Sequence, residues 1–244
     1  MKPFLILQLR PETEASDDEY AAFLAKGELA QEQTRRIRLE SEPLPRDIDL
    51  ADYAGVIVGG GPGCVSDRED EKSDVDKRIE AAILSLMPAI VESDIPYLGC
   101  CYGIGILAHF LGSTVNKERY GESVGAVKCQ LTAAGKADRI LSNVPNQFMA
   151  FVGHKEALQQ LPEGCRHLLS SEPCPYQMIR YKNNIYATQF HPEADSEVFE
   201  ARIRLYRNSG YFPSEKAEEI TRFCHQQDVH APVTILKNFI NAYR

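Results

Sequence analysis

A cysteine stands where a predicted buried strand gives way to a predicted helix, in the stretch LGCCYGIG. The GxCxG pattern places Cys101 between Gly99 and Gly103. A sharp strand-to-helix turn strains the backbone at its apex, so it needs small residues on both sides. At a helix amino terminus, the dipole and the free N–H groups also favour a thiolate. We therefore predict that Cys101 is a nucleophile with a lowered pKa and that Cys100 points into the core.

A base and an acid follow late in the chain, at the end of the strand-like segment ATQFHPEAD. His191 is followed two residues later by Glu193, with Pro192 making the step rigid. A thiol nucleophile needs a base, and the base needs an orienting group. The sequence therefore predicts a catalytic triad of Cys101, His191 and Glu193.

The elements that must position this triad alternate between strands and helices in the first half of the chain. Apolar runs bounded by glycine or proline indicate buried strands, and apolar residues at helical spacing indicate helices. Such alternation predicts an α/β fold, with a doubly wound, mostly parallel sheet and helices on both faces. The predicted strands are 3–9, 37–40, 55–63 and 95–101, and the predicted helices are 17–34, 72–87 and 103–111.

The second half of the chain contains shorter strand-like pieces and then three helical segments. We expect the strands to complete the sheet with antiparallel pairs, and 182–184 to form a hairpin turn. We predict one domain over residues 1–195 and a helical C-terminal extension, 196–244, packed on it. The predicted strands are 124–132, 147–153, 166–171, 176–181 and 185–191, and the helices are about 195–209, 213–227 and 232–243.

Three motifs together resemble those of the class I glutamine amidotransferases, especially the domain of this family found in GMP synthase. They are GxCxG after a strand, a GGGP turn about forty residues earlier, and the late QFHPE. The resemblance spans about Pro3 to Asp195 and implies a flavodoxin-like fold. It also implies that Cys101 attacks the side-chain amide of glutamine, that His191 moves protons, and that Glu193 orients the imidazole. Ammonia then leaves a γ-glutamyl thioester, which water hydrolyses.

The same resemblance implies an oxyanion hole, because a tetrahedral intermediate needs preorganised N–H donors. These donors would be the backbone of Tyr102, just after the nucleophile, and of Gly61 or its neighbour Gly60 in VGGGPG. Taken alone, the glycine run is typical of a turn that ends a strand.

Two further residues are predicted to border the substrate. Many family members have glutamine four residues after the nucleophile, where this chain has Gly105. His154 lies in a segment, FVGHKEALQQLPEG, in which family members often carry a histidine near the substrate pocket. A structural His154 is an equally good interpretation.

Three functions remain open at this stage. The first is glutamine hydrolysis, and the second, favoured by Gly105, is a thiol hydrolase acting on other γ-glutamyl compounds. The third is a non-catalytic regulatory module on the same fold, against which the complete triad argues. Ammonia transfer generally needs an acceptor activated by ATP, and the sequence has no P-loop. We therefore expect either a separate synthetase chain as partner or a simple hydrolase.

Composition excludes several other classes of function. The formal net charge is −8, and Lys and Arg are interspersed with acids, which argues against a nucleic-acid surface. The apolar runs are strand-sized and Met1 is not followed by a leader pattern, so we predict a cytoplasmic protein that does not contact membranes. The seven cysteines lack metal-type spacing, and we predict reduced thiols, no metal and no cofactor.

Overall fold

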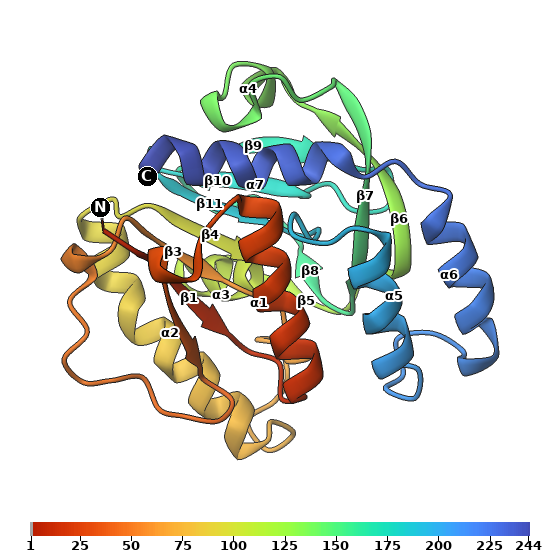
Figure 1. Ribbon diagram of the computed structural model, residues 1–244, viewed down its shortest axis with the longest axis horizontal. Coiled ribbons are helices and arrows are strands. Elements are labelled where there is room, and N and C mark those ends of the chain that lie inside the picture. Colours follow the sequence, from red (N-terminus) through yellow and green to blue (C-terminus); the bar gives the residue numbers. More distant parts are fainter. Residues whose placement is uncertain (1) are drawn as a thin grey trace.

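The computed structural model describes residues 2–244, and its centre is a mixed sheet (Figure 1). Nine strands within these residues build that sheet. In spatial order they are β2 (Thr34–Arg38), β1 (Phe4–Gln8), β3 (Gly55–Val58), β4 (Tyr97–Cys100), β11 (Ile185–Thr188), β10 (Met178–Tyr181), β9 (Cys165–Ser170), β6 (Glu122–Leu131) and β7 (Gln147–His154). A separate antiparallel pair joins β5 (Val115–Asn116) to β8 (Ala157–Leu158).

The sheet is parallel at one end and antiparallel at the other. Strands β2, β1, β3, β4 and β11 pair parallel with one another, whereas the pairs from β11 through β10, β9 and β6 to β7 are antiparallel. Cys100 on β4 pairs with Thr188 on β11, and Cys101 N donates to Thr188 O at 2.7 Å. This register brings the residue after β4 next to the segment that follows β11, so Cys101 and His191 share one edge of the sheet.

Helices cover both faces of the sheet, as the sequence predicts. On one face, α1 (Thr13–Gly27) packs beside α7 (His230–Tyr243), and both bury apolar side chains against β1 and β11 (Figure 1). On the other face lie α2 (Asp74–Glu92) and α3 (Tyr102–Phe110). The first core cluster includes Ile6, Phe23, Tyr186, Leu236 and Phe239, and the second includes Leu7, Val58, Ile83, Met87 and Leu107.

Two helices stand beside the antiparallel end of the sheet. These are α5 (Ser196–Leu205) and α6 (Ala217–His225), which form a third apolar cluster with Phe151 of β7 (Figure 1). Phe199 of α5 stacks on Phe151 with ring centroids 4.5 Å apart. The remaining short elements are α4 (Ala133–Lys136) and 3-10 turns at Gln31–Gln33, Leu50–Asp52, Arg139–Leu141 and Ser214–Lys216.

Some predicted boundaries are wrong for local reasons. The helix predicted at 17–34 ends at Gly27, because Glu28 adopts a left-handed conformation with φ +53° and the chain then enters β2. The helix predicted to stop before Pro88 runs on to Glu92. A proline inside a helix removes one hydrogen bond, and the burial of Met87 and Ile90 offsets that loss. The domain boundary at residue 195 stays a prediction. Helix α7, which belongs to the predicted C-terminal extension, shares its core with β1.

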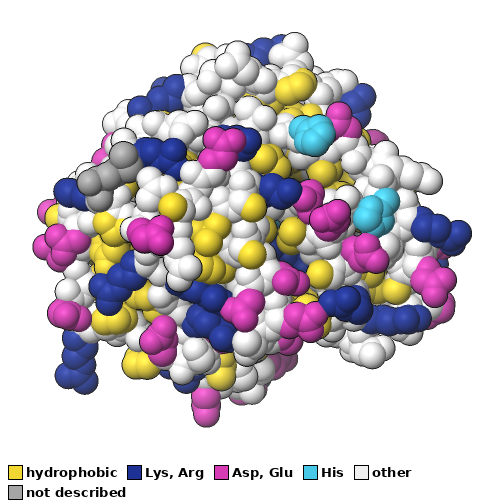
Figure 2. All heavy atoms as spheres, viewed as in Figure 1, with side chains coloured by type: hydrophobic (Ala, Val, Ile, Leu, Met, Phe, Trp, Pro, Cys, Tyr) yellow, Lys and Arg dark blue, Asp and Glu magenta, His cyan; other side chains and the backbone are white. Residues whose placement is uncertain are grey.

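The face of the molecule drawn in Figure 2 agrees with the charge pattern of the sequence. On the face drawn in Figure 2, Lys and Arg side chains alternate with Asp and Glu rather than forming a basic band. Among residues 2–244, no helix combines the length and apolar character needed to cross a membrane.

Candidate active site

Cys101 occupies a strained turn between β4 and α3. Its φ of +53° and ψ of −94° lie in a region that non-glycine residues rarely adopt. A Cβ on Gly99 would lie 2.9 Å from the carbonyl carbon of Gly103, so a larger residue cannot stand there. At Gly103 a Cβ would make only ordinary contacts, the nearest at 3.5 Å. The elbow is therefore present, and of its two flanking glycines Gly99 is the one that sterics demand. Cys100 points into the core, as predicted.

His191 and Glu193 form a buried hydrogen-bonded pair. His191 Nδ1 donates to Glu193 Oε1 at 3.0 Å, and both side chains are buried. The position that a Cβ on Gly60 would take lies 2.7 Å from His191 Cε1 and 3.5 Å from Cys101 Cβ. The imidazole and the thiol thus lie next to each other against the glycine turn, and the structure brings the three predicted triad residues together.

Glu193 also binds a guanidinium group that the sequence pattern did not indicate. Arg202 on α5 donates through Nη2 to Glu193 Oε1 at 2.8 Å, and its side chain is buried as well. Burial favours the neutral carboxyl, but Arg202 and His191 together hold the pKa of Glu193 well below its ordinary value. Glu193 is therefore a carboxylate at neutral pH.

Burial dominates the titration of the other two groups. It lowers the pKa of His191 below 6.5; Glu193 opposes this shift, and Arg202 and Arg10 add to it. It raises the pKa of Cys101 to about 12, although Arg10 opposes that shift. The prediction of a lowered thiol pKa at the helix terminus is therefore wrong, because desolvation outweighs the attraction of the Arg10 and Arg202 guanidinium groups.

A buried ion pair supports the glycine turn. Glu19 on α1 accepts from Arg10 Nε at 2.8 Å and from Gly60 N at 3.1 Å. The N–H of Gly60 is thus already engaged, which leaves Gly61 as the better candidate for the oxyanion hole. A Cβ on Gly61 would lie 3.4 Å from Tyr102 Cδ1, so these two residues adjoin each other.

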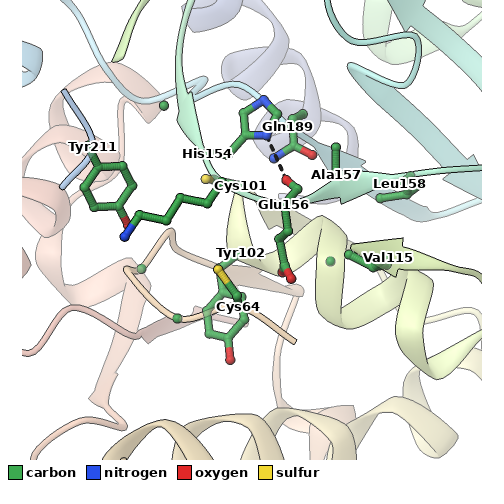
Figure 3. A pocket seen from close by; sticks show the side chains of 15 residues that line it. Cys64, Cys101, Tyr102, Val115, His154, Glu156, Ala157, Leu158, Gln189 and Tyr211 are labelled. Carbon is green, nitrogen blue, oxygen red and sulfur yellow. Dashed lines mark hydrogen bonds between the residues drawn. The ribbon is translucent and has the colours of Figure 1, made fainter. Parts of the chain in front are cut away.

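Two pockets meet at Cys101, and Gly61, Gly153 and Tyr211 also border both. We call the first the β8 pocket, and its empty space, open solvent included, is about 340 Å³. Figure 3 shows Tyr211 and Glu156 on opposite sides of Cys101. We call the second the α5 pocket, and its empty space, open solvent included, is about 420 Å³. The β8 pocket is lined by Tyr102, Gly105, His154, Glu156, Leu158 and Gln189, and the α5 pocket by Arg10, His191, Phe199, Ile203, Tyr206 and Tyr211.

Gly105 leaves space that a carboxylate fills. A Cβ on Gly105 would lie 2.9 Å from Glu156 Oε1. The two oxygens of Glu156 accept from Val65 N at 3.0 Å and Ser66 N at 2.9 Å, which fixes the side chain in place. The residue opposite Gly105 in the β8 pocket is therefore an acid, which our sequence analysis did not identify.

His154 borders the β8 pocket, but its ring is hydrogen-bonded on both sides. Nε2 lies 2.7 Å from Glu122 Oε2, and Nδ1 lies 2.8 Å from the carbonyl oxygen of Glu156. A contact of His154 with substrate stays a prediction.

One set of side chains within residues 2–244 has the composition of a metal site. Ligand atoms of Glu122, His154 and Cys174, all buried, lie within 4.8 Å of one another. Gln177 Nε2 also donates to Glu122 Oε2 at 2.6 Å. With Ser171 Oγ, which donates to Glu122 Oε1 at 3.3 Å, the carboxylate is already hydrogen-bonded to three side chains, and the arrangement is that of a buried polar network.

Comparison with known proteins identifies the class to which this fold belongs. The family model described as glutamine amidotransferase class-I matches residues 28–206. The chain therefore belongs to the class I glutamine amidotransferase family.

Curated relatives narrow the likeness further. The chain is 30% identical to the glutamine-hydrolysing GMP synthase of Thermosipho africanus over 206 residues, which cover 79% of this chain and 36% of that protein. It is 31% identical to the enzyme of the same name from Aquifex aeolicus over 177 residues, or 71% of this chain and 31% of that protein. The chain thus spans about a third of the length of these relatives.

Solved structures share the fold over the whole chain. A glutamine amidotransferase from Thermotoga maritima has a TM-score of 0.78 at 18% identity, and the match covers 100% of this chain and 98% of that one. A glutamine amidotransferase from Methylobacillus flagellatus has a TM-score of 0.74 at 19% identity, covering 100% and 94% of the two chains. The predicted fold class is therefore confirmed.

Proposed function

We propose that this chain hydrolyses a γ-glutamyl amide, in the first instance glutamine, through a Cys101–His191–Glu193 triad. The observation that carries the proposal is the strained Cys101 apex beside His191, whose Nδ1 is held by the buried Glu193 at 3.0 Å. Family membership and the glutamine-hydrolysing relatives support the same chemistry. A non-catalytic module would have no need for three such groups in one place.

The position of the proton on His191 favours general-base catalysis when the Cys101 thiol attacks. A carboxylate only accepts hydrogen bonds, so the single proton of neutral His191 stands on Nδ1 and Nε2 is free to act as a base. Because the pKa of Cys101 is about 12, His191 takes the thiol proton as the sulfur attacks. The Sγ–C bond forms, the C–N bond breaks, and His191 gives that proton to the departing ammonia.

Water completes the cycle. Its oxygen attacks the thioester carbon while His191 accepts one of its protons, and this proton passes to Sγ as the C–S bond breaks. The N–H groups of Tyr102 and Gly61 stabilise both tetrahedral intermediates in this proposal. Each such donor contributes about 3 kcal/mol to barrier lowering in comparable hydrolases.

The fate of the ammonia is a separate proposal. The GMP synthases that match this chain are longer proteins, and this chain covers 36% and 31% of them. We propose that a separate synthetase chain receives the ammonia, with simple hydrolysis as the alternative, and that the protein acts in the cytoplasm. Co-purification followed by a glutaminase assay decides between them, because activity unaffected by any co-purifying protein would exclude the partnered form.

Three substitutions test the triad. Cys101→Ser and His191→Ala should abolish the release of glutamate from glutamine. Thermal melting should show that both variants are folded. Glu193→Gln should retain measurable activity, since an orienting group contributes less than the nucleophile or the base. Near-complete activity in His191→Ala would contradict the proposed mechanism.

A further inference from the structure

The two pockets at Cys101 would receive different parts of the substrate in the proposed reaction. His191 lines the α5 pocket, whereas Tyr102 lines the β8 pocket. In acyl transfer from an amide, the base returns its proton to the leaving nitrogen, so the leaving group must face His191. The oxyanion donor of Tyr102 and the fixed carboxylate of Glu156 belong to the other side, where the acyl group lies.

The leaving-group side is built for more than ammonia. The α5 pocket is walled by Val124, Phe199, Ile203 and the rings of Tyr206 and Tyr211. Phe199 is held in place by its stack on Phe151, with ring centroids 4.5 Å apart. Ammonia carries no carbon and gains nothing from such walls, whereas an aliphatic or aromatic group would bury apolar surface against them.

The charges in this pocket are already balanced within the protein. Arg10 pairs with Glu19 at 2.8 Å, and Arg202 pairs with Glu193 at 2.8 Å. An anionic leaving group would have to compete with Glu19 and Glu193 for these guanidinium groups, and Nε and Nη1 of Arg202, which have no hydrogen-bond partner among the described residues, are free to donate to an acceptor atom of the leaving group. A neutral apolar group meets no such competition.

We propose, on the basis of the triad chemistry above, that the α5 pocket binds the carbon-bearing leaving group of an N-substituted γ-glutamyl amide with a neutral aliphatic or aromatic amine. The step is balanced as for glutamine. The Sγ–C bond forms, the C–N bond breaks, and the proton held by His191 goes to the amine nitrogen. One water then converts the thioester to glutamate and restores the thiol.

The decisive comparison uses two substrates with leaving groups of similar basicity, L-glutamine and γ-L-glutamyl-benzylamide. Glutamate release by the purified full chain gives kcat/KM for each. We expect the benzylamide to be preferred at least tenfold. Because benzylamine and ammonia are similarly basic, this preference reports binding of the leaving group rather than its intrinsic reactivity.

A matched pair of variants locates the effect. Ile203→Trp fills the α5 pocket. It should lower the kcat/KM for the benzylamide relative to that for glutamine at least tenfold. Ile220→Trp, on α6 outside both pockets, should leave the ratio unchanged. Thermal melting of both variants shows whether they fold, and the wild-type comparison stands without them.

The same assays distinguish a failure of the α5 pocket assignment from a failure of the triad chemistry. Turnover of glutamine that depends on Cys101, with glutamine preferred over the benzylamide, would overturn the pocket assignment alone. Absence of Cys101-dependent glutamate release from both substrates would overturn the triad chemistry, and the pocket assignment with it.

Discussion

His191 and Arg202 bind the same oxygen of Glu193, the imidazole Nδ1 at 3.0 Å and the guanidinium Nη2 at 2.8 Å. A cation on that oxygen weakens the attraction between Glu193 and a protonated His191. Burial and Arg202 therefore both lower the pKa of His191. The result is a base that is neutral at physiological pH and is held by Glu193, whose own partner Arg202 belongs to α5 rather than to the parallel half of the sheet.

Removing this cation should move the acid limb of the pH–activity profile. His191 must be neutral to act, so activity is lost as pH falls through its pKa, which lies below 6.5 in the native chain. In Arg202→Met, Glu193 stabilises the imidazolium more strongly, the pKa of His191 rises, and the acid limb of kcat/KM shifts to higher pH. His191 also faces Arg10 and Cys101, which this variant leaves in place.

Arg202→Lys is the control for that experiment, because it keeps the charge and should keep the limb near its native position. Arg202→Met should also lower the free energy of unfolding by about 3–5 kcal/mol, since it leaves a buried carboxylate without its cation. Denaturant unfolding measures that loss. An acid limb at the same pH in all three proteins would show that Arg202 only supports the fold.

Alkylation of Cys101 should keep accelerating with pH. Its pKa is about 12, so between pH 7 and 10 the thiolate fraction, and with it the iodoacetamide rate, should rise about tenfold per pH unit without levelling off. Cys101 borders two pockets whereas Cys100 is fully buried, so Cys100 should react more slowly. Mass spectrometry of the labelled peptide distinguishes the two, and a plateau below pH 9 would reveal a lower thiol pKa.

His154 should contribute more to stability than a half-buried histidine elsewhere. It pairs with Glu122 at 2.7 Å, and both side chains are buried. His154→Ala removes one hydrogen bond to that carboxylate, while Gln177 and Ser171 still donate to it, and we expect a loss of about 1.5–3 kcal/mol in the free energy of unfolding. His167, bonded to the carbonyl oxygens of Leu169 and Pro175, is the matched control, with an expected loss of about 1 kcal/mol in His167→Ala. Equal losses in the two variants would show that the buried His154–Glu122 pair adds no more to stability than the hydrogen bonds of His167.

Two glycines in α3 should respond differently to the same substitution. A Cβ at Gly105 would meet Glu156 Oε1 at 2.9 Å, whereas one at Gly103 has its nearest neighbour at 3.5 Å. Gly103→Ala should stabilise the helix by up to about 1 kcal/mol. Gly105→Ala should instead be less stable than Gly103→Ala by about 1–2 kcal/mol, because it displaces a carboxylate that Val65 and Ser66 hold. Thermal or denaturant unfolding of both variants measures the difference, and equal stabilities would mean that Glu156 moves freely.

The sequence by itself determined the layered sheet and the nucleophile's elbow. Burial of short apolar runs and the backbone strain at Cys101 are local properties, so they can be recognised from a few neighbouring residues. The closeness of Cys101 and His191 follows almost as directly, since each comes soon after the carboxyl end of one of two adjacent parallel strands. The bounds of α1 could not be predicted in this way, because a left-handed residue such as Glu28 has no strong local signal.

Only the tertiary structure decided how the site is charged and shaped. Arg202 meets Glu193, Glu19 takes the N–H of Gly60, and Glu156 fills the space beside Gly105 through contacts between different elements of the fold. The pKa of Cys101 also rises rather than falls, because burial is a sum over the whole surrounding structure and outweighs the nearby cations Arg10 and Arg202. The α5 pocket likewise exists because α5 docks against β7, a contact that no short sequence pattern encodes.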